Sequence, residues 1–435
     1  MKSLTRPLFV ALLSFYFLAS VAQELKPLDE ALKVERWLHQ NRSEHRQGVA
    51  WPIVAGDTTI VTNLYSGTSG IVLFYLELYH STNNKVFLEE AEKGARYILE
   101  LPHGRKISFD EVGLYTGEAG VCFMFNQLFA ATKNNQYKSA AEQSLERLRI
   151  TAKTTGDRAD WRYNDIVYGG AGIGLMLLNM ATPEALNLAK RTGNELLVKA
   201  LSGEGGKKWF MDTAMVRQKY YMPNFSHGTA GVSYFLAKLY ERTGNKEYLD
   251  GAMAGARHLT TIENEDAWVY HHDTEEGKDL YYLTWCHGPA GTARLYYLLY
   301  QITKDESWKA RIVKASEAIM KCGIPTKELP GFWNNVSMCC GSASVASFFL
   351  DLHELFGEKA YLDFSMEITK NLIGRGTRDG DGMKWVQAEH RRRPEFIQAQ
   401  TGYMQGAAGI GMWFLRLDSF QKKLRPSITL PDNPF

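Results

Sequence analysis

Three of the five cysteines in this chain lie in two short glycine-containing turns of similar form. Cys286 belongs to TWCHGPAG at residues 284–291, and the pair Cys339 and Cys340 belongs to SMCCGSAS at residues 337–344. Three thiolates that meet at one point, with a fourth position left for water or substrate, would make a catalytic zinc site. The spacing leaves two alternatives open: a disulfide among these three cysteines, and plain packing of small apolar side chains.

The N-terminal residues have the form of a secretory signal peptide. Lys2 and Arg6 precede an apolar run at residues 7–19, and Ser-Val-Ala at residues 20–22 provides a small-residue cleavage site. The sequence therefore predicts a signal peptide over residues 1–22 and a secreted or periplasmic mature chain. The apolar run is too short for a membrane span, so none is expected after cleavage. Because paired thiols oxidise outside the cytoplasm, a bound metal would explain how vicinal cysteines stay reduced there.

The mature chain has the composition of a globular protein. With 45% hydrophobic and 23% charged residues, 435 residues can build a large core. The formal net charge of +2 falls to about zero once Lys2 and Arg6 are removed (2 − 2 = 0). The sequence contains no basic stripe, so nucleic acid is not expected as a partner. We expect one domain over residues 23–425 and a C-terminal tail over residues 426–435.

A repeat organises the whole chain. Seven segments open with a glycine pair, or a near miss of one, and continue as an apolar run, and their first glycines are Gly67, Gly117, Gly169, Gly228, Gly288, Gly341 and Gly406. Such segments, apolar on nearly every side, predict buried helices, for which the glycines allow an unusual φ or close backbone approach. Segments such as residues 85–101 lie between them and carry the period of amphipathic surface helices.

These alternating segments predict an all-α fold, an α/α toroid with a double ring of about seven inner and seven outer helices. An open solenoid is the alternative, but it would expose apolar inner helices at its ends. In a closed ring, the residues directly before the first glycines should face one shared mouth; they are Ser66, Thr116, Tyr168, His227, His287, Cys340 and Gln405. Tryptophans recur before several glycines, as core or roof packing or as a platform for sugars or peptides: Trp51, Trp161, Trp209, Trp268, Trp333 and Trp385.

The glycine-led helices, WCHGPAG and MCCG together resemble the lanthionine synthetase C-like family over about residues 27–420. The resemblance implies an α/α toroid with a catalytic zinc ion. Cys286 and Cys339 match the family's two zinc cysteines, and Cys340 stands where most members have a zinc histidine. Three thiolates on Zn²⁺ carry a net charge of −1, which makes a bound substrate thiolate more nucleophilic.

The resemblance also concerns four other positions, three as candidate catalytic residues and one as a departure from the family. His227, in NFSHGTAG, matches the acid/base histidine, and Asp165, four residues before Gly169, matches the active-site aspartate. His287 follows the first zinc cysteine, where the family has tyrosine or histidine, and is the third candidate catalytic residue. Tyr282 replaces an arginine of the bacterial cyclases, which puts stabilisation of a substrate enolate in doubt. Structural alternatives remain open: a helix cap for the histidines, and a turn or a pair with Arg162 for the aspartate.

This reading predicts addition of a zinc-bound thiolate to dehydroalanine or dehydrobutyrine, with His227 protonating the enolate and Asp165 orienting the histidine. The partner would be a peptide or small-thiol substrate, and a dehydratase would supply the dehydrated residue. One rival is a secreted carbohydrate-active enzyme on the same architecture, which needs two opposed carboxylates, with Asp165, Glu118 and the pair Asp110-Glu111 available. The other is a non-catalytic, zinc-containing peptide-binding module.

Overall fold

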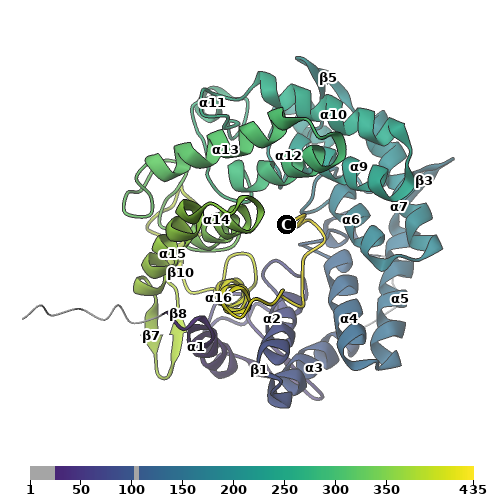
Figure 1. Ribbon diagram of the computed structural model, residues 1–435. Helices are drawn as coiled ribbons and strands as arrows, with labels where there is room; N and C mark the ends of the chain where they lie inside the picture. Colours follow the sequence, from purple (N-terminus) through teal and green to yellow (C-terminus); the bar gives the residue numbers. More distant parts are fainter. Residues whose placement is uncertain (1–24, 102–106) are drawn as a thin grey trace, which may run out of the picture.

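The computed structural model describes residues 25–101 and 107–435. The predicted signal peptide, residues 1–22, lies outside them. The described helices form two concentric layers around a central axis (Figure 1). The predicted α/α toroid is thereby confirmed. No helix among the described residues combines the length and the apolarity that a bilayer crossing requires.

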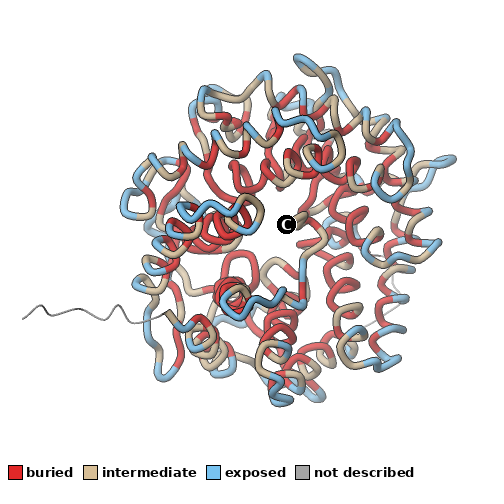
Figure 2. The backbone as a smooth tube through the Cα atoms, in the orientation of Figure 1, coloured by how far each residue is buried: buried red, intermediate tan, exposed pale blue. Residues whose placement is uncertain are grey.

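Seven inner helices begin directly after the first glycine of each repeat. They are α2 (Thr68–Thr82), α4 (Glu118–Thr132), α6 (Gly170–Met180), α9 (Thr229–Thr243), α12 (Pro289–Thr303), α14 (Ser342–Phe356) and α16 (Ala407–Gln421). Their outer partners, in the same order, are α3 (Lys85–Leu99), α5 (Asn135–Thr151), α7 (Pro183–Val198), α10 (Lys246–Thr261), α13 (Glu306–Lys321), α15 (Lys359–Gly374) and α1 (Pro27–Gln40). The inner helices are almost wholly buried and the outer loops exposed (Figure 2), as their apolar and amphipathic patterns predict.

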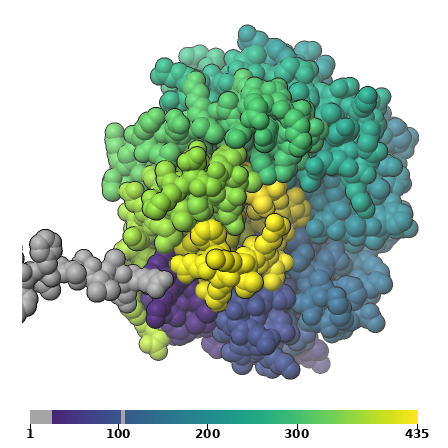
Figure 3. Space-filling view, in the orientation of Figure 1, coloured from purple at the N-terminus to yellow at the C-terminus, as the bar shows by residue number. Residues whose placement is uncertain are grey.

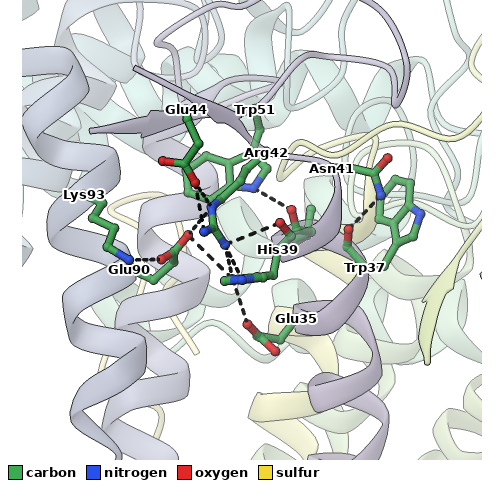
Figure 4. Close-up of polar contacts among 10 residues, drawn as sticks. Glu35, Trp37, His39, Asn41, Arg42, Glu44, Trp51, Glu90 and Lys93 are labelled. Atoms are coloured by element: carbon green, nitrogen blue, oxygen red, sulfur yellow. Dashed lines mark hydrogen bonds and ion pairs between the residues drawn. The ribbon is translucent and has the colours of Figure 1, made fainter. Parts of the chain in front are cut away.

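The two ends of the chain close the ring. Helix α1 packs against α16 and so serves as the outer helix of the seventh repeat, while α16 also contacts α2 of the first. Behind α1, Arg42 bridges to Glu90 of α3 at 3.2 Å, and Trp51 donates its indole N–H to the carbonyl of Leu38 at 2.9 Å (Figure 4). Because the ring is closed, neither end of the inner layer exposes its apolar helix surface to water, as both ends of an open solenoid would.

Backbone hydrogen bonds link all seven repeats into one circuit. The bonded amides and carbonyls belong to the residues two positions before each first glycine, except that in the third repeat Ile166 donates in place of Val167. The seven N–H···O bonds are Tyr65–Tyr115 (2.7 Å), Tyr115–Val167 (3.2 Å), Ile166–Ser226 (3.2 Å), Ser226–Cys286 (2.9 Å), Cys286–Cys339 (3.3 Å), Cys339–Met404 (2.9 Å) and Met404–Tyr65 (2.8 Å). This circuit satisfies buried amides that no helix can pair and fixes neighbouring turns relative to one another.

Close packing explains the glycine pairs. The first glycines have negative φ values, for example −113° at Gly67 and −125° at Gly288, so an unusual φ is not the reason for them. A Cβ at Gly291 or Gly231 would collide with the carbonyl oxygen of the residue six positions earlier. Glycine is therefore required where the preceding turn folds back onto the helix. Ser344 takes the place of the second glycine in the sixth repeat, and its hydroxyl donates to the carbonyl of Gly341 at 2.9 Å.

Short hairpins connect outer helices to the next turn. They are β1 (Ser43–Glu44) with β2 (Val49–Ala50), β3 (Lys153–Thr155) with β4 (Arg158–Asp160), β5 (Leu201–Gly203) with β6 (Gly206–Lys208), β7 (Thr377–Asp379) with β8 (Gly382–Lys384), and β9 (Gln387–Ala388) with β10 (Ile397–Gln398). A 3-10 turn (Phe109–Glu111), α8 (Thr213–Gln218) and α11 (Glu275–Lys278) complete the connections. Five of the six recurring tryptophans donate their indole N–H to an outer helix: Trp51, Trp161, Trp209, Trp268 and Trp385. These five pack between the layers, whereas Trp333 lines the mouth.

Residues 426–435, predicted as a tail, pack into the ring. The chain ends at the centre of the toroid (Figure 1), and its last residues cover the middle of this face (Figure 3). The amides of Ser427 and Ile428 donate to the carboxylate of Glu77 on α2, at 3.0 and 2.8 Å. This segment is therefore an integral part of the fold.

Candidate active site

The three predicted cysteines meet at the mouth of the ring. The Sγ of Cys340 lies 3.1 Å from that of Cys286 and 3.4 Å from that of Cys339, and all three lie within 4.8 Å of one another. None is disulfide-bonded; a disulfide needs about 2.05 Å. Ligands about 2.3 Å from a tetrahedral zinc ion stand roughly 3.8 Å apart, so this spacing fits a shared metal ion. The predicted convergence is confirmed, and the cluster can hold a metal.

The backbone circuit brings the two cysteine turns together. The N–H of Cys286 donates directly to the carbonyl of Cys339, which makes the fifth and sixth repeats neighbours at this level. The Sγ of Cys340, one residue closer to the glycine, contacts both of the other sulfurs. The local repeat thus places the first two cysteines, and ring order makes them adjacent.

Hydroxyl and amide donors surround the sulfurs. Tyr65 Oη donates to Cys339 Sγ at 3.3 Å, and Thr284 Oγ1 lies 3.4 Å from Cys286 Sγ. Gln405 Nε2 lies 3.7 Å from Cys340 Sγ and 3.0 Å from Tyr65 Oη. Donors in these positions favour thiolates and orient metal ligands. Sequence analysis placed Gln405 at the mouth but did not assign Tyr65 or Thr284 to the site.

The three thiols shift one another's pKa values in opposite directions. Burial opposes ionisation of Cys286, but hydrogen bonds from Cys339, Cys340 and Thr284 prevail and hold the pKa of Cys286 well below its usual value. The pKa of Cys340 is raised by its bonds to the other two sulfurs, and that of Cys339 is raised by burial.

His227 and Asp165 form a pair beside the sulfurs. His227 Nδ1 lies 2.7 Å from Asp165 Oδ2, and Asp165 is fully buried while its other oxygen accepts the N–H of Tyr168 at 3.0 Å. Arg162, the alternative partner, pairs with Asp110 at 3.7 Å instead. This arrangement directs Nε2 of the histidine toward the pocket, where it can exchange a proton with a substrate.

His287 lies between His227 and a histidine that sequence analysis did not select, His271. The ring centroids are 5.5 Å and 4.3 Å from His287, respectively. Burial, and then the nearby His271, hold the pKa of His287 well below its ordinary value, so its imidazole is neutral. Burial also lowers the pKa of His271 to about 3. These uncharged but polar rings form one wall of the pocket.

One pocket connects these groups to solvent. Its empty volume is about 1190 Å³, open solvent at the mouth included. Of the seven residues before the first glycines, four line it: His227, His287, Cys340 and Gln405. Thr116 lines a separate groove, and neither Ser66 nor Tyr168 belongs to the pocket lining. The shared mouth is therefore confirmed for the last four repeats, and the pocket lies to one side of the axis.

An arginine-rich loop between β9 and β10 also lines the pocket. Arg391 lies close to Tyr282, with which it lines the pocket, and pairs with Glu276 of α11 at 2.9 Å, and Arg392 pairs with the same carboxylate at 2.7 Å. A guanidinium group thus reaches the position where the sequence has tyrosine in place of arginine. The run HRRR at residues 390–393 was the signal available in the sequence, but its distance along the chain hid its connection to the cysteines.

The carboxylates considered for a glycosidase lie outside the main pocket. Glu118 pairs with Arg147 and shares another groove with Glu111, Asp165 is engaged by the histidine, and Asp110 accepts from Tyr163 at 2.6 Å. Among the described residues, Glu389 is the only carboxylate that lines the main pocket. The two opposed carboxylates of glycoside hydrolysis are thus not assembled there.

A double ring of helices around a thiol triad and a histidine–aspartate pair defines an α/α-toroid protein with a candidate metal centre. The chain belongs to the lanthionine synthetase C-like family, whose model matches residues 60–430. Nisin cyclase has a similar structure, with a TM-score of 0.63, 15% identity, and coverage of 90% of this chain and 93% of that chain. The Lin0763 protein from Listeria innocua is also similar, with a TM-score of 0.52, 16% identity, and coverage of 92% of this chain and 99% of that chain.

Carbohydrate-active proteins share the architecture. An inactive variant of an α-1,6-mannanase of Salegentibacter sp. HEL1_6, in complex with α-1,6-mannotetrose, matches with a TM-score of 0.52 at 10% identity, over 90% of this chain and 98% of that one. At such low identity these structures establish the fold alone.

Proposed function

We propose that this protein is a zinc-dependent enzyme that activates a thiol for addition to dehydroalanine or dehydrobutyrine and so forms a thioether. The observation that carries the proposal is the meeting of three sulfurs within 4.8 Å of one another in the pocket that also holds His227. Membership in the lanthionine synthetase C-like family supports it. A carbohydrate-active function is less well supported, because the pocket lacks two opposed carboxylates.

Cys286, Cys339 and Cys340 would hold the zinc ion. A zinc ion keeps a coordinated substrate thiol in its thiolate form at neutral pH. The three protein thiolates leave the centre with a net negative charge. Tyr65 and Gln405 donate toward two of these sulfurs and disperse part of that charge.

His227 would carry the proton. The substrate thiol loses its proton to Nε2, the sulfur bonds to the β-carbon as the C=C π bond breaks, and the imidazolium returns the proton to the α-carbon. Atoms and charge balance without an external base. Asp165 keeps Nδ1 protonated and stabilises the imidazolium through the buried 2.7 Å contact.

Arg391 would stabilise the negative charge that develops on the substrate carbonyl oxygen. Its guanidinium reaches Tyr282 from the β9–β10 loop and so supplies a cation close to the position where the bacterial cyclases carry arginine. Preorganised donors aimed at developing charge make a large contribution to catalysis.

The substrate would be a dehydrated peptide whose own cysteine closes a ring, or such a peptide together with a small thiol. Its dehydrated residue requires an earlier elimination of water from serine or threonine, which a dehydratase partner would carry out. With the predicted signal peptide, we propose that this chemistry takes place in the periplasm or outside the cell.

The test combines metal analysis with a cyclisation assay on the purified mature chain. Elemental analysis should find about one zinc ion per chain. A synthetic peptide with one dehydroalanine and one cysteine should lose its reactivity toward iodoacetamide, since ring closure changes no mass but consumes the thiol. Cys286→Ala should abolish both signals, while Cys122→Ala, a buried cysteine outside the cluster, should retain them.

The outcomes separate the candidate functions. A wild-type chain that holds no zinc would contradict the proposal outright. Zinc without any thioether product, across peptides of different sequence, would identify a zinc-containing peptide-binding module instead.

A further inference from the structure

The C-terminal segment places a carboxylate on the axis of the ring. Asp432 is fully buried. Its Oδ1 accepts the hydroxyl of Tyr115 at 3.0 Å, and its Oδ2 accepts the indole N–H of Trp285 at 3.0 Å. Arg294 donates to the same Oδ2 at 2.9 Å and to the backbone carbonyl of Asp432 at 3.0 Å. Two neutral donors and one guanidinium therefore satisfy this buried charge, a combination that gives strong hydrogen bonds.

These donors come from distant parts of the ring. Tyr115 belongs to the second repeat, and Trp285 and Arg294 belong to the fifth, so two repeats separate them on one side of the ring and three on the other. The rings of Tyr115 and Trp285 meet edge to face, with centroids 5.1 Å apart. The carboxylate thus bridges the inner layer across the axis.

The bridge acts directly on the backbone circuit. Tyr115 is itself a member of the circuit, and Trp285 directly precedes another member, Cys286, in the sequence. In this pair of residues, the side chain of Trp285 is held by Asp432, and that of Cys286 lies in the sulfur cluster. Any rotation of the indole away from the carboxylate must move the turn that carries the first cysteine.

We propose that Asp432 is a positioning residue for the metal centre, which it holds in place from the opposite side of the turn through Trp285. The inference rests on the proposed function, because it concerns the same cysteines. Metal ligands must be held within about 0.5 Å of the productive geometry. A chain that lacks the Asp432 carboxylate leaves the buried hydroxyl of Tyr115 and the buried indole N–H of Trp285 without their charged acceptor, so the Trp285–Cys286 turn loses its anchor.

The experiment compares two buried carboxylates that hold the same C-terminal segment. Asp432→Asn removes the charge that contacts Trp285, whereas Glu77→Gln weakens the bonds to the amides of Ser427 and Ile428 and does not touch Trp285. Zinc release is followed by a chromophoric chelator, and the melting temperature is measured in parallel. We expect both variants to melt earlier. Only Asp432→Asn should release zinc faster, by about tenfold, as for partners that orient metal ligands.

A double-mutant cycle tests the connecting residue. Trp285→Phe keeps the aromatic packing but lacks the N–H donor, so Asp432→Asn should accelerate zinc release much less in that background. If Asp432→Asn fails to fold, Trp285→Phe alone must accelerate zinc release. Equal acceleration by Asp432→Asn and Glu77→Gln, or none by either, would overturn the proposal.

A readout without metal distinguishes failure of the inference from failure of the proposed function. If the wild-type chain binds no zinc, the proposed function is refuted, and the rate of Cys286 alkylation in the metal-free chain becomes the measure. Asp432→Asn should then alter this rate, whereas Glu77→Gln should leave it at the wild-type value; the same rate in all three chains would refute the positioning role.

Discussion

Replacing Asp165 by asparagine tests the proposed proton transfer with little change in shape. The asparagine carbonyl can still accept the N–H of Tyr168, which now binds the carboxylate at 3.0 Å. The amide NH₂ would face His227 Nδ1, where Oδ2 now lies 2.7 Å away. Since two donors cannot face each other, Nδ1 must become the acceptor, and the imidazolium loses its charged partner.

The expected magnitude follows from that single contact. A buried hydrogen bond to a charged group contributes about 1.5–3 kcal/mol, which corresponds to roughly 10- to 150-fold in rate. We therefore expect Asp165→Asn to lower kcat for thioether formation by about 100-fold while zinc content and melting temperature stay close to wild type. The assay is loss of iodoacetamide-reactive thiol from the dehydroalanine peptide under saturating conditions.

Asp160→Asn is the matched control. Asp160 lies in the same connection and forms a partly buried pair with Lys199 outside the pocket lining, so its loss should leave kcat unchanged. An Asp165→Asn chain with wild-type kcat would refute the assigned role of the pair. Loss of zinc in parallel with activity would show that Asp165 supports the fold and not the proton transfer.

Three further predictions concern the pocket, the outer layer and the repeat. Arg391→Gln removes the guanidinium at Tyr282 and should lower kcat/KM about tenfold with zinc content unchanged, as measured by the same peptide assay. Burial raises the pKa of Glu35 from 4.5 to about 7, so the folded state binds more protons and wild-type stability falls as pH rises through this range. Glu35→Gln should remove that dependence, so that at pH 8 its free energy of unfolding in urea exceeds that of the wild type by at most about 3 kcal/mol. The same slope of unfolding free energy against pH in both chains would contradict this prediction. Gly231→Ala places a Cβ against a backbone carbonyl and should cost about 3 kcal/mol or more, whereas Gly374→Ala, with open space around it, should be neutral or stabilising.

The backbone circuit explains why repeats rather than single motifs carry this site. Each turn donates to the next, so the residue two positions before a glycine bonds to its counterpart in the neighbouring repeat, with Ile166 as the one donor displaced by a position. Cys286 and Cys339 occupy this position in adjacent repeats, and Asp432 contacts one member of the circuit, Tyr115, and the residue before another, Trp285. The order of the repeats around the ring can therefore bring catalytic groups together, while the packing of the helices stays the same in every repeat.

The sequence by itself determined the helical repeat and most of the candidate metal centre. Glycine pairs and apolar runs act locally: they specify where an inner helix begins, and a residue's offset from the glycine specifies its place in the turn. Cys286, Cys339, Cys340 and His227 were placed by that offset. Asp165 was found by the family resemblance, and the structure then showed its contact with the histidine.

Only the tertiary structure decided the contacts that close the ring and complete the pocket. Helix α1 packs against α16, and Arg391 lies close to Tyr282 although it belongs to another connection. Asp432 lies 317 residues after Tyr115 and accepts a hydrogen bond from its hydroxyl. Periodicity describes only neighbours along a helix, and these partners belong to segments brought together by closure. Their contacts depend on which repeats face each other across the axis, a property of the assembled ring and not of any one stretch of sequence.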